Sequence, residues 1–210
     1  MGTKTNIEIA IYPRALPSEM CDRICEMGDN LIQNPGEVLD DGIVHVDKIE
    51  RHDLIAWFPK GPNCQWLYKE MTDILEQLNK QHWQFELKSV ETIQYSQYGP
   101  DCHFDWHVDW VPTNDDLDGG AGQRRVSLSV QLSDPDNYTG GYFEIAQKQN
   151  SEKPEFYDVD LLIAGDPRRK FAESARPKGS IVAFPSNLWH RVTPVHSGVR
   201  CSLVTWGIQS

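Results

Sequence analysis

Two residue types that bind metals, a histidine and an aspartate, stand two positions apart at His107 and Asp109. Around them, the run from Phe104 to Trp110 alternates apolar and polar side chains, which predicts a β-strand. On a strand both side chains point to the same side, roughly 6.5 to 7 Å apart along the backbone, so their tips can meet on one ion. A second histidine from a distant strand would complete a set of two imidazoles and one carboxylate, and His190 is the best candidate.

Such a ligand set leaves three coordination positions open, which is the arrangement of non-haem Fe(II) oxygenases. A His-x-Asp triplet alone is common, and a surface pair is the alternative interpretation. The remaining histidines lack a comparable setting, and we expect them at the surface or in packing: His45, His52, His82 and His196. His103 lies near the triplet but beside Asp105 in register, so it is only a minor candidate ligand.

Arg200 is the candidate for binding an acidic ligand. It lies ten residues beyond His190, and Ser202 shares its face of a predicted strand, Val199–Trp206. A guanidinium binds a carboxylate through two parallel hydrogen bonds, and a hydroxyl adds a further donor. The pair therefore fits a dicarboxylic co-substrate, while a surface ion pair of Arg200 is the alternative.

Short strands must hold these residues in place. The clearest is Arg125–Ser133, where aliphatic residues alternate with Ser or Gln, so that one face is packed and the other is polar. Shorter strands are plausible within 34–61. Further strands are expected at 7–12, 85–95, 104–110, 142–146, 156–163, 180–184, 188–192 and 199–208, and loops at 147–155 and 166–170.

Two helices are expected before the strand-rich part. The first starts at Pro17–Ser18, and the second is capped by Asn63 and ends near Asn79; each has apolar residues at helical spacing. Helices followed by about eight strands predict an α+β, mainly β, fold, a sandwich or barrel with the helices packed outside it. With 210 residues, we expect a single domain, with helical support over about 1–84 and a catalytic β core over about 85–210.

The composition restricts the partners. The net charge of −11 repels phosphate backbones, so a nucleic-acid partner is not expected. No apolar run has the length of a signal peptide or a membrane span, so we expect a soluble, cytoplasmic protein without membrane contact. Five cysteines without a C-x-x-C pair indicate free thiols. The oligomeric state does not follow from the sequence.

Several motifs in order resemble the prolyl 4-hydroxylase-type 2-oxoglutarate/Fe(II) dioxygenases, and most of all the bacterial PKHD-type hydroxylases. The likeness runs from about Glu86 to the C-terminus, and the helical first third fits more loosely. The segments that carry it are Tyr98–Asp109, Arg125–Pro135, Tyr138–Gly141, Lys178–Pro185, His190–Pro194 and Gly198–Arg200.

The resemblance implies a double-stranded β-helix, a jelly-roll or cupin-like core with supporting N-terminal helices. It implies Fe(II), with 2-oxoglutarate and O2 as co-substrates and ascorbate as a reductant. The iron ligands would be His107, Asp109 and His190, and Arg200 would bind the distal carboxylate of 2-oxoglutarate. The other residues expected around the co-substrate are Tyr98, Ser202 and Gln131, with Ser127 a weaker match on the strand of Gln131.

The implied reaction hydroxylates a C–H bond and releases succinate and CO2. A carboxylate at position 109 favours hydroxylation, because related halogenating enzymes have a small residue there. The expected substrate is a peptidyl residue such as proline, with polar loops at 111–123 and 147–178 closing over it and 168–170 pairing with acidic groups. The alternatives are a hydroxylase of a small metabolite, an oxidative nucleic-acid demethylase, which the charge disfavours, and a non-catalytic metal-binding β-barrel sensor. Arg191 is expected to point away from the iron, and its substitution to have little effect.

Overall fold

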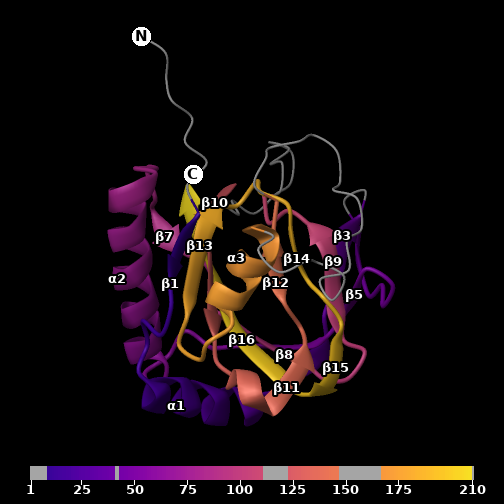
Figure 1. Cartoon of the computed structure of the whole chain (residues 1–210). Coiled ribbons are helices and arrows are strands. Elements are labelled where there is room, and N and C mark those ends of the chain that lie inside the picture. The colour runs from indigo at the N-terminus through magenta and orange to yellow at the C-terminus, as the bar shows by residue number, and fades with distance from the viewer. Residues whose placement is uncertain (1–8, 41–42, 111–122, 147–166, 210) are drawn as a thin grey trace.

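The fold places two β-sheets against each other, with the two N-terminal helices on the outer face of the larger one (Figure 1). A computed structural model describes residues 9–40, 43–110, 123–146 and 167–209. The larger sheet has eight strands. Its order is β1 (Ala10–Tyr12), β13 (Ile181–Pro185), β10 (Gln123–Gln131), β16 (Arg200–Gln209), β8 (Gln94–Tyr98), β6 (Leu54–Trp57) and β2 (Asn34–Pro35), with β7 (Ser89–Val90) paired to β16.

The smaller sheet has four strands, and two ribbons of two strands complete the β structure of the described residues. The smaller sheet runs β12 (Phe143–Ile145), β14 (His190–Val192), β9 (His103–His107) and β5 (Arg51–His52). The ribbons are β3 (Val38–Asp40) with β4 (Ile43–His45), and β11 (Tyr138–Gly140) with β15 (Val195–Gly198). A short 3-10 helix, η1 (Pro135–Asn137), leads into β11.

Both predicted N-terminal helices are present as α1 (Ser18–Asp29) and α2 (Gln65–His82). The predicted cap at Asn63 is wrong: the N-cap of α2 is Cys64, without a side-chain hydrogen bond. Backbone bonds of the preceding turn, including that from the Cys64 N–H to the Gly61 carbonyl, replace a side-chain cap. The helix also runs three residues past Asn79, whose side-chain amide bonds both backbone groups of Phe85 and so fixes the chain after the helix.

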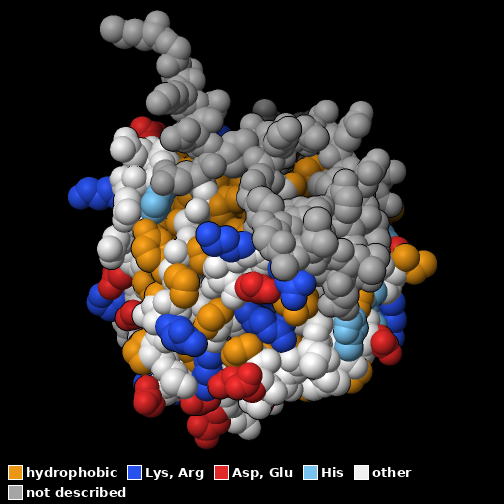
Figure 2. All heavy atoms as spheres, in the orientation of Figure 1, with side chains coloured by type: hydrophobic (Ala, Val, Ile, Leu, Met, Phe, Trp, Pro, Cys, Tyr) orange, Lys and Arg blue, Asp and Glu red, His pale blue; other side chains and the backbone are white. Residues whose placement is uncertain are grey.

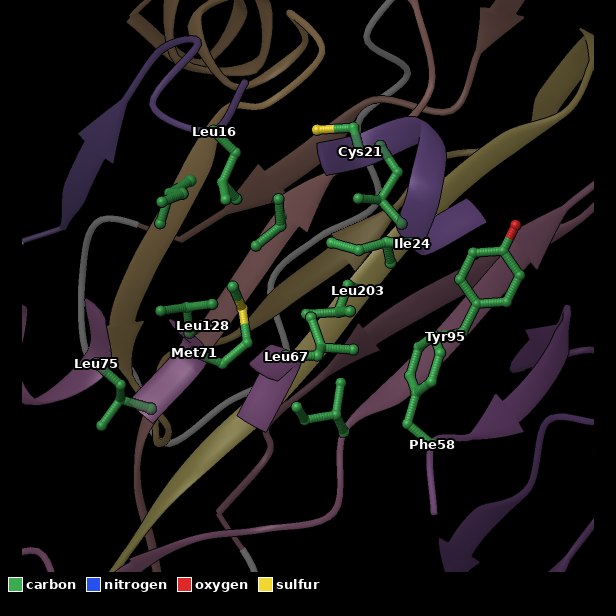
Figure 3. Packing of buried hydrophobic residues seen from close by; sticks show 14 of the residues in the cluster. Leu16, Cys21, Ile24, Phe58, Leu67, Met71, Leu75, Tyr95, Leu128 and Leu203 are labelled. Atoms are coloured by element: carbon green, nitrogen blue, oxygen red, sulfur yellow. The ribbon is translucent and has the colours of Figure 1, made fainter. Parts of the chain in front are cut away.

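The main apolar core lies between these two helices and the outer face of the larger sheet (Figure 3). Ile24 of α1 and Leu67 and Met71 of α2 are fully buried there. They pack with the aliphatic positions of β10, such as Leu128, and with Leu203 of β16. A second cluster, including Phe143, Phe184 and Val192, lies between the two sheets.

The polar face of β10 is buried too, rather than exposed to solvent. Ser127, Ser129 and Gln131 keep between 1% and 9% of their surface exposed. They alternate with the core residues and therefore point into the space between the sheets. The alternation predicted from sequence is confirmed, but its polar side faces the interior of the protein.

The segment 166–170 was predicted as a loop, but its described residues, 167–170, are the start of a helix, α3 (Pro167–Ala175). Ala172 and Ala175 are buried, and α3 packs against β12 and β1. The small apolar residues that anchor this helix lie beyond the basic run that indicated a loop. The predicted strand 156–163, the loop 147–155 and most of the loop 111–123 lie outside the described residues.

Basic and acidic side chains are interspersed on the face shown in Figure 2. In the part of the chain that the structure describes, no helix has both the length and the apolar character needed to cross a membrane.

Candidate functional site

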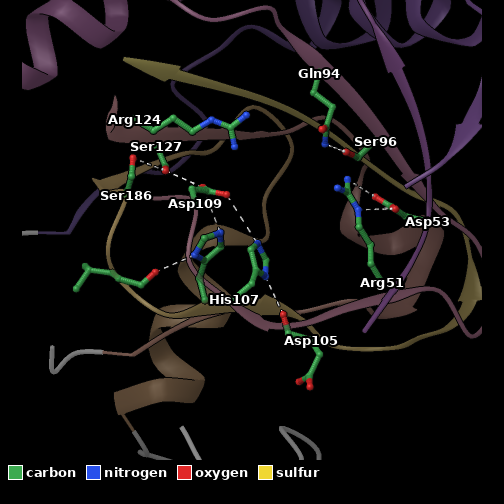
Figure 4. A network of polar contacts seen from close by, with 12 residues as sticks. Arg51, Asp53, Gln94, Ser96, Asp105, His107, Asp109, Arg124, Ser127 and Ser186 are labelled. Atoms are coloured by element: carbon green, nitrogen blue, oxygen red, sulfur yellow. Dashed lines mark hydrogen bonds and ion pairs between the residues drawn. The ribbon is translucent and has the colours of Figure 1, made fainter. Parts of the chain in front are cut away.

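The three predicted metal ligands meet at one point between the sheets, where Figure 4 labels His107 and Asp109. One ligand atom from each of His107, Asp109 and His190 lies within 4.8 Å of the other two. The two histidines are direct partners in the pairing of β9 with β14, and Asp109 follows two residues after β9 ends. The His190 Nε2 lies 3.4 Å from Asp109 Oδ2, and the His107 Nε2 lies 3.9 Å from Asp109 Oδ1.

Backbone carbonyls orient both imidazoles. The His107 Nδ1 lies 2.7 Å from the Asp105 carbonyl, and the His190 Nδ1 lies 3.0 Å from the Leu188 carbonyl. Because a carbonyl only accepts, each Nδ1 carries the proton, and each Nε2 presents a lone pair toward Asp109. This is the tautomer that a metal ligand needs.

Burial and mutual charge favour the ligating protonation states. Burial and the neighbouring His190 hold the pKa of His107 well below its usual range. Burial raises the pKa of Asp109, but the two imidazoles outweigh this effect and hold that pKa far below its usual range. A neutral His107 and a charged Asp109 can therefore bind a cation without first losing a proton.

A β-bulge in β9 sets the direction of His107. Phe104 pairs with Val192 and His107 with His190, so three steps along β9 face two along β14. The extra residue places Phe104 and His107 on the same face, where their rings stack with centroids 3.4 Å apart. The strict alternation predicted for 104–110, with Phe104 opposite His107, is wrong at this point. The guanidinium of Arg51 lies over the other ring face of Phe104, 4.5 Å from its centroid.

Two serines fix the carboxylate of Asp109. Ser127 Oγ lies 2.7 Å from Asp109 Oδ2 and 3.0 Å from Ser186 Oγ, and all three side chains are buried. Because a carboxylate only accepts, Ser127 donates to Asp109 and accepts from Ser186. The backbone N–H of Asp109 donates to the Ser186 carbonyl at 3.0 Å. The resemblance indicated Ser127 only weakly, and no sequence signal pointed to Ser186.

Arg200 lies in the interior, only 3% exposed, at the start of β16. Its Nη1 donates to Ser202 Oγ at 3.3 Å, and its guanidinium lies over the ring of Tyr98, its partner on β8, at 5.3 Å. In the described ranges, no Asp or Glu side chain forms an ion pair with it. A buried cation in this state is costly unless an anion joins it, so the residue fits the carboxylate of a ligand.

A pocket lies beside Arg200. Gln131 and Phe143 line it together with Arg200. The ring of Phe143 also lies 5.7 Å from that of His190, so one aromatic side chain touches both parts of the site. The four expected co-substrate residues, Arg200, Tyr98, Ser202 and Gln131, are all buried on neighbouring strands of the larger sheet. Their role in binding stays a prediction.

The other histidines stand apart from this centre. His103 has carbonyl partners at both ring nitrogens, those of Asp101 and Ile49, and His82 is hydrogen-bonded to Tyr12. His45 is exposed. Within the described residues they form no metal-binding group with the triad.

Arg191 points away from His190, as its place on β14 predicted, but it is not a surface residue. It is 2% exposed, its Nε lies 2.5 Å from Glu144 Oε2, and it lies over the ring of Trp106 at 4.9 Å. Loss of Arg191 would leave a buried carboxylate without this partner, so the structure gives a reason to expect an effect on stability, where the sequence led us to expect little effect of its substitution.

The donor set fits Fe(II). Two imidazole nitrogens and one carboxylate are the ligands that non-haem Fe(II) sites use, and they leave positions for a chelating co-substrate and O2. The buried guanidinium of Arg200, which forms no ion pair with an acidic side chain of the described residues, fits a co-substrate that carries a second carboxylate. The residues present thus match both groups that the sequence predicted.

Comparison with known proteins agrees with this chemistry. Residues 93–207, more than half of the chain, match the family described as 2OG-Fe(II) oxygenase superfamily. A PKHD-type hydroxylase of Crocosphaera subtropica is 34% identical over 121 residues, which are 57% of this chain and 43% of the relative. The chain spans about half the length of the curated relatives it matches.

Two solved structures share the fold over nearly the whole chain. A prolyl-4-hydroxylase of Pseudomonas putida has a TM-score of 0.65 at 19% identity, covering 98% of this chain and 94% of its own. A prolyl hydroxylase of Trichoplax adhaerens, in complex with a peptide fragment of the hypoxia inducible factor oxygen degradation domain, has a TM-score of 0.61 at 14% identity, covering 97% of this chain and 84% of its own. The expected double-stranded β-helix is thus confirmed.

Proposed function

Because this chain belongs to the 2OG-Fe(II) oxygenase superfamily, we propose that it hydroxylates a C–H bond of a peptidyl residue, with proline as the first candidate. The overall reaction would convert substrate, 2-oxoglutarate and O2 into hydroxylated product, succinate and CO2. The observation that carries the chemistry is the convergence of His107, Asp109 and His190 on one point, together with a pocket lined by a buried Arg200 that has no acidic partner among the described residues.

Each residue of the site has a role in this proposal. His107, Asp109 and His190 would hold Fe(II), which with 2-oxoglutarate and O2 supplies the oxidising chemistry of hydroxylation. Arg200 and Ser202 would hold the distal carboxylate and so orient the other end of 2-oxoglutarate toward the metal ligands. Phe104 and Phe143 shield the imidazoles from water.

A peptide substrate is supported by the printed names of the structural relatives. One is a prolyl-4-hydroxylase, and the other was solved with a peptide fragment. The net charge of −11 disfavours a nucleic-acid substrate. One fold hosts many substrates, so the substrate is tested separately from the chemistry. A role for ascorbate stays a prediction.

Anaerobic titration with Fe(II) and 2-oxoglutarate tests the chemistry. We expect a weak visible metal-to-ligand charge-transfer band, and succinate release once O2 and substrate are added. Alanine at His107, Asp109 or His190 should weaken iron binding and abolish succinate release, since each change removes one of three protein ligands. Asp109→Gly is the informative variant, because it can retain metal and co-substrate while losing hydroxylation. Binding of both ligands without succinate release under any condition would favour a sensor.

The substrate is tested by mass spectrometry. Proline-containing peptides and a panel of small metabolites are incubated with the Fe(II)-loaded enzyme, and products heavier by 16 Da are sought. Oxidation of a free metabolite with no peptide product would contradict the peptidyl proposal and leave the oxygenase chemistry intact.

Arg200→Ala tests the co-substrate pocket. Since a hydrogen bond to a charged group contributes about 1.5–3 kcal/mol, the Kd for 2-oxoglutarate should rise roughly ten- to hundred-fold. The Kd for the metal alone should stay the same, because Arg200 is not a ligand. Unchanged 2-oxoglutarate affinity would remove Arg200 from the pocket.

A further inference from the structure

Tyr138 lies in the same pocket as Arg200, although no role was assigned to it from the sequence. It is the first residue of β11, it is 3% exposed, and it lines the pocket together with Gln131 and Arg200. Its strand, β11, is not part of the larger sheet, whereas Gln131 and Arg200 lie on β10 and β16 of that sheet. The pocket therefore has a polar wall built by three separate strands.

A glycine lets this tyrosine come close to the arginine. Gly141 has a φ of +59°, and a Cβ there would lie 3.1 Å from Arg200 Cδ and 3.4 Å from Tyr138 Cε2. The same Cβ would lie only 2.8 Å from Val195 Cγ2, so another residue would not fit without displacement. Arg200 and the Tyr138 ring thus flank the same backbone position.

The phenol has a proton to donate. Gln131 Nε2 donates to Tyr138 Oη at 3.1 Å, so this contact uses the oxygen of Tyr138 as an acceptor and leaves its O–H for another partner. Burial raises the pKa of Tyr138, and the nearby Arg200 and Arg176 reduce that rise without cancelling it. Tyr138 is therefore a neutral hydrogen-bond donor at physiological pH.

Arg176, just after α3, holds Tyr138 in place. Its Nη2 donates to the Tyr138 carbonyl and its Nη1 to the Gly140 carbonyl, both at 2.8 Å. Its guanidinium lies 4.3 Å from the centroid of the Tyr138 ring. Backbone and ring are thus fixed by one side chain, which lowers the entropy cost of using the hydroxyl to bind a ligand.

We propose that the Tyr138 hydroxyl donates a hydrogen bond to the distal carboxylate of 2-oxoglutarate, beside the guanidinium of Arg200, and so selects 2-oxo acids that carry a second carboxylate. This inference rests on the use of 2-oxoglutarate in the proposed function. Tyr138 would be a binding residue, with Arg176 as the residue that positions it.

The test combines one variant with two ligands. Tyr138→Phe removes one oxygen atom, and Tyr142→Phe is the matched control, because Tyr142 lines the same pocket and also lies against Arg176. The ligands are 2-oxoglutarate and 2-oxovalerate, which has the same chain length and the same metal-chelating end but no distal carboxylate. Each is titrated anaerobically into the Fe(II)-loaded protein, and the charge-transfer band gives the Kd without turnover.

Tyr138→Phe should raise the Kd for 2-oxoglutarate roughly ten-fold or more. The Kd for 2-oxovalerate should not change, and Tyr142→Phe should alter neither. Equal weakening of both ligands would show a structural role and overturn the proposal, as would an unchanged Kd for 2-oxoglutarate. If the wild-type protein bound neither ligand, or did not prefer 2-oxoglutarate, the use of 2-oxoglutarate itself would be refuted.

A second measurement covers the case in which Tyr138→Phe does not fold. With 3-fluorotyrosine at position 138, which keeps the hydroxyl, the ¹⁹F resonance should shift when 2-oxoglutarate binds and stay in place with 2-oxovalerate. An unmoved resonance with bound 2-oxoglutarate would overturn the proposal.

Discussion

The buried arginines of the described chain differ in their partners. This difference distinguishes arginines that stabilise the fold from an arginine that is suited to bind a ligand. Arg51 donates two hydrogen bonds to the carboxylate of Asp53, at 2.9 and 3.1 Å, and Arg191 is paired with Glu144. Arg200 has a serine and an aromatic ring instead. A buried cation without a carboxylate costs free energy of folding, so its presence next to a pocket indicates a position reserved for an anionic ligand.

Ser127 should control the metal through Asp109. Ser127→Ala removes the hydrogen bond to Asp109 Oδ2, which leaves the carboxylate free to rotate. Loss of such a supporting contact typically lowers metal affinity about 10- to 100-fold, so the Kd for Fe(II) or Co(II) should rise by that factor. Isothermal titration calorimetry with the metal measures this Kd in the wild type and the variant.

Two controls accompany this variant. Ser127→Thr keeps the hydroxyl and should restore most of the affinity. Ser129→Ala, two residues further along the same face of β10, should leave the metal Kd unchanged. Equal metal affinity in wild type and Ser127→Ala would show that the backbone alone holds Asp109.

Arg191→Met should destabilise the fold strongly. It leaves Glu144, 5% exposed, without the guanidinium that donates to it, and breaking a buried pair on one side costs about 3–5 kcal/mol. Urea unfolding of the metal-free protein measures this loss. Lys69→Met is the matched control, because it breaks an exposed pair with Asp73 and should change the unfolding midpoint little. A stable Arg191→Met protein would contradict the role given to the pair.

The elements that carry the site depend on close contacts that no local pattern shows. The bulge in β9 turns His107 onto the face of Phe104, and α1 lies so close to β8 that only a glycine fits between them. A Cβ at Gly28 would lie 2.5 Å from Cδ1 of Tyr95, a fully buried ring whose hydroxyl is held by Asp29 at 2.7 Å. The ring is fixed at its far end and cannot move aside.

Gly28→Ala should therefore destabilise the protein, although alanine is the better helix former by up to about 1 kcal/mol. Overpacking of a core contact costs about 1–3 kcal/mol, so the melting temperature should fall by several degrees. Gly61→Ala is the control, since nothing lies within 4 Å of a Cβ at that position. Thermal unfolding followed by circular dichroism compares the two, and an equal or higher melting temperature in Gly28→Ala would contradict the close packing.

For the molecule as a whole, the interior between the sheets is polar enough to make stability depend on pH. Burial, together with Asp53, raises the pKa of Tyr98 well above its usual range. In the unfolded chain this tyrosine loses its proton near pH 10, while in the folded protein it stays protonated. A raised folded pKa gives stability that is present below the unfolded pKa and is lost as the pH rises above it.

The free energy of unfolding should therefore fall by about 1.4 kcal/mol per pH unit above pH 10 from Tyr98 alone. Tyr98→Phe should remove that part of the slope, and urea unfolding at pH 8, 10 and 11 measures it in both proteins. Absorbance of tyrosinate at 295 nm should be the same in both folded proteins at pH 11. An equal slope in wild type and variant would show that Tyr98 titrates normally.

Local patterns in the sequence were sufficient for the features that depend on neighbouring residues. Period-two alternation located β10, helical spacing located α1 and α2, and the His-x-Asp triplet identified two ligands of the candidate metal centre. These succeed because strand and helix geometry fix which nearby side chains share a face. The distant His190 and Arg200 were chosen as candidates because their residue types limited the chemistry to few possibilities.

Contacts between distant segments required the tertiary structure. Ser186 beside Ser127, Glu144 beside Arg191 and Tyr138 beside Arg200 join elements that are far apart in sequence, and no periodicity encodes their meeting. The helix at 167–175 was missed because its stability comes from packing on β12 and β1 rather than from its basic first turn. The bulge in β9 follows from its pairing with β14, so the face on which Phe104 meets His107 could be fixed only once the sheet had formed.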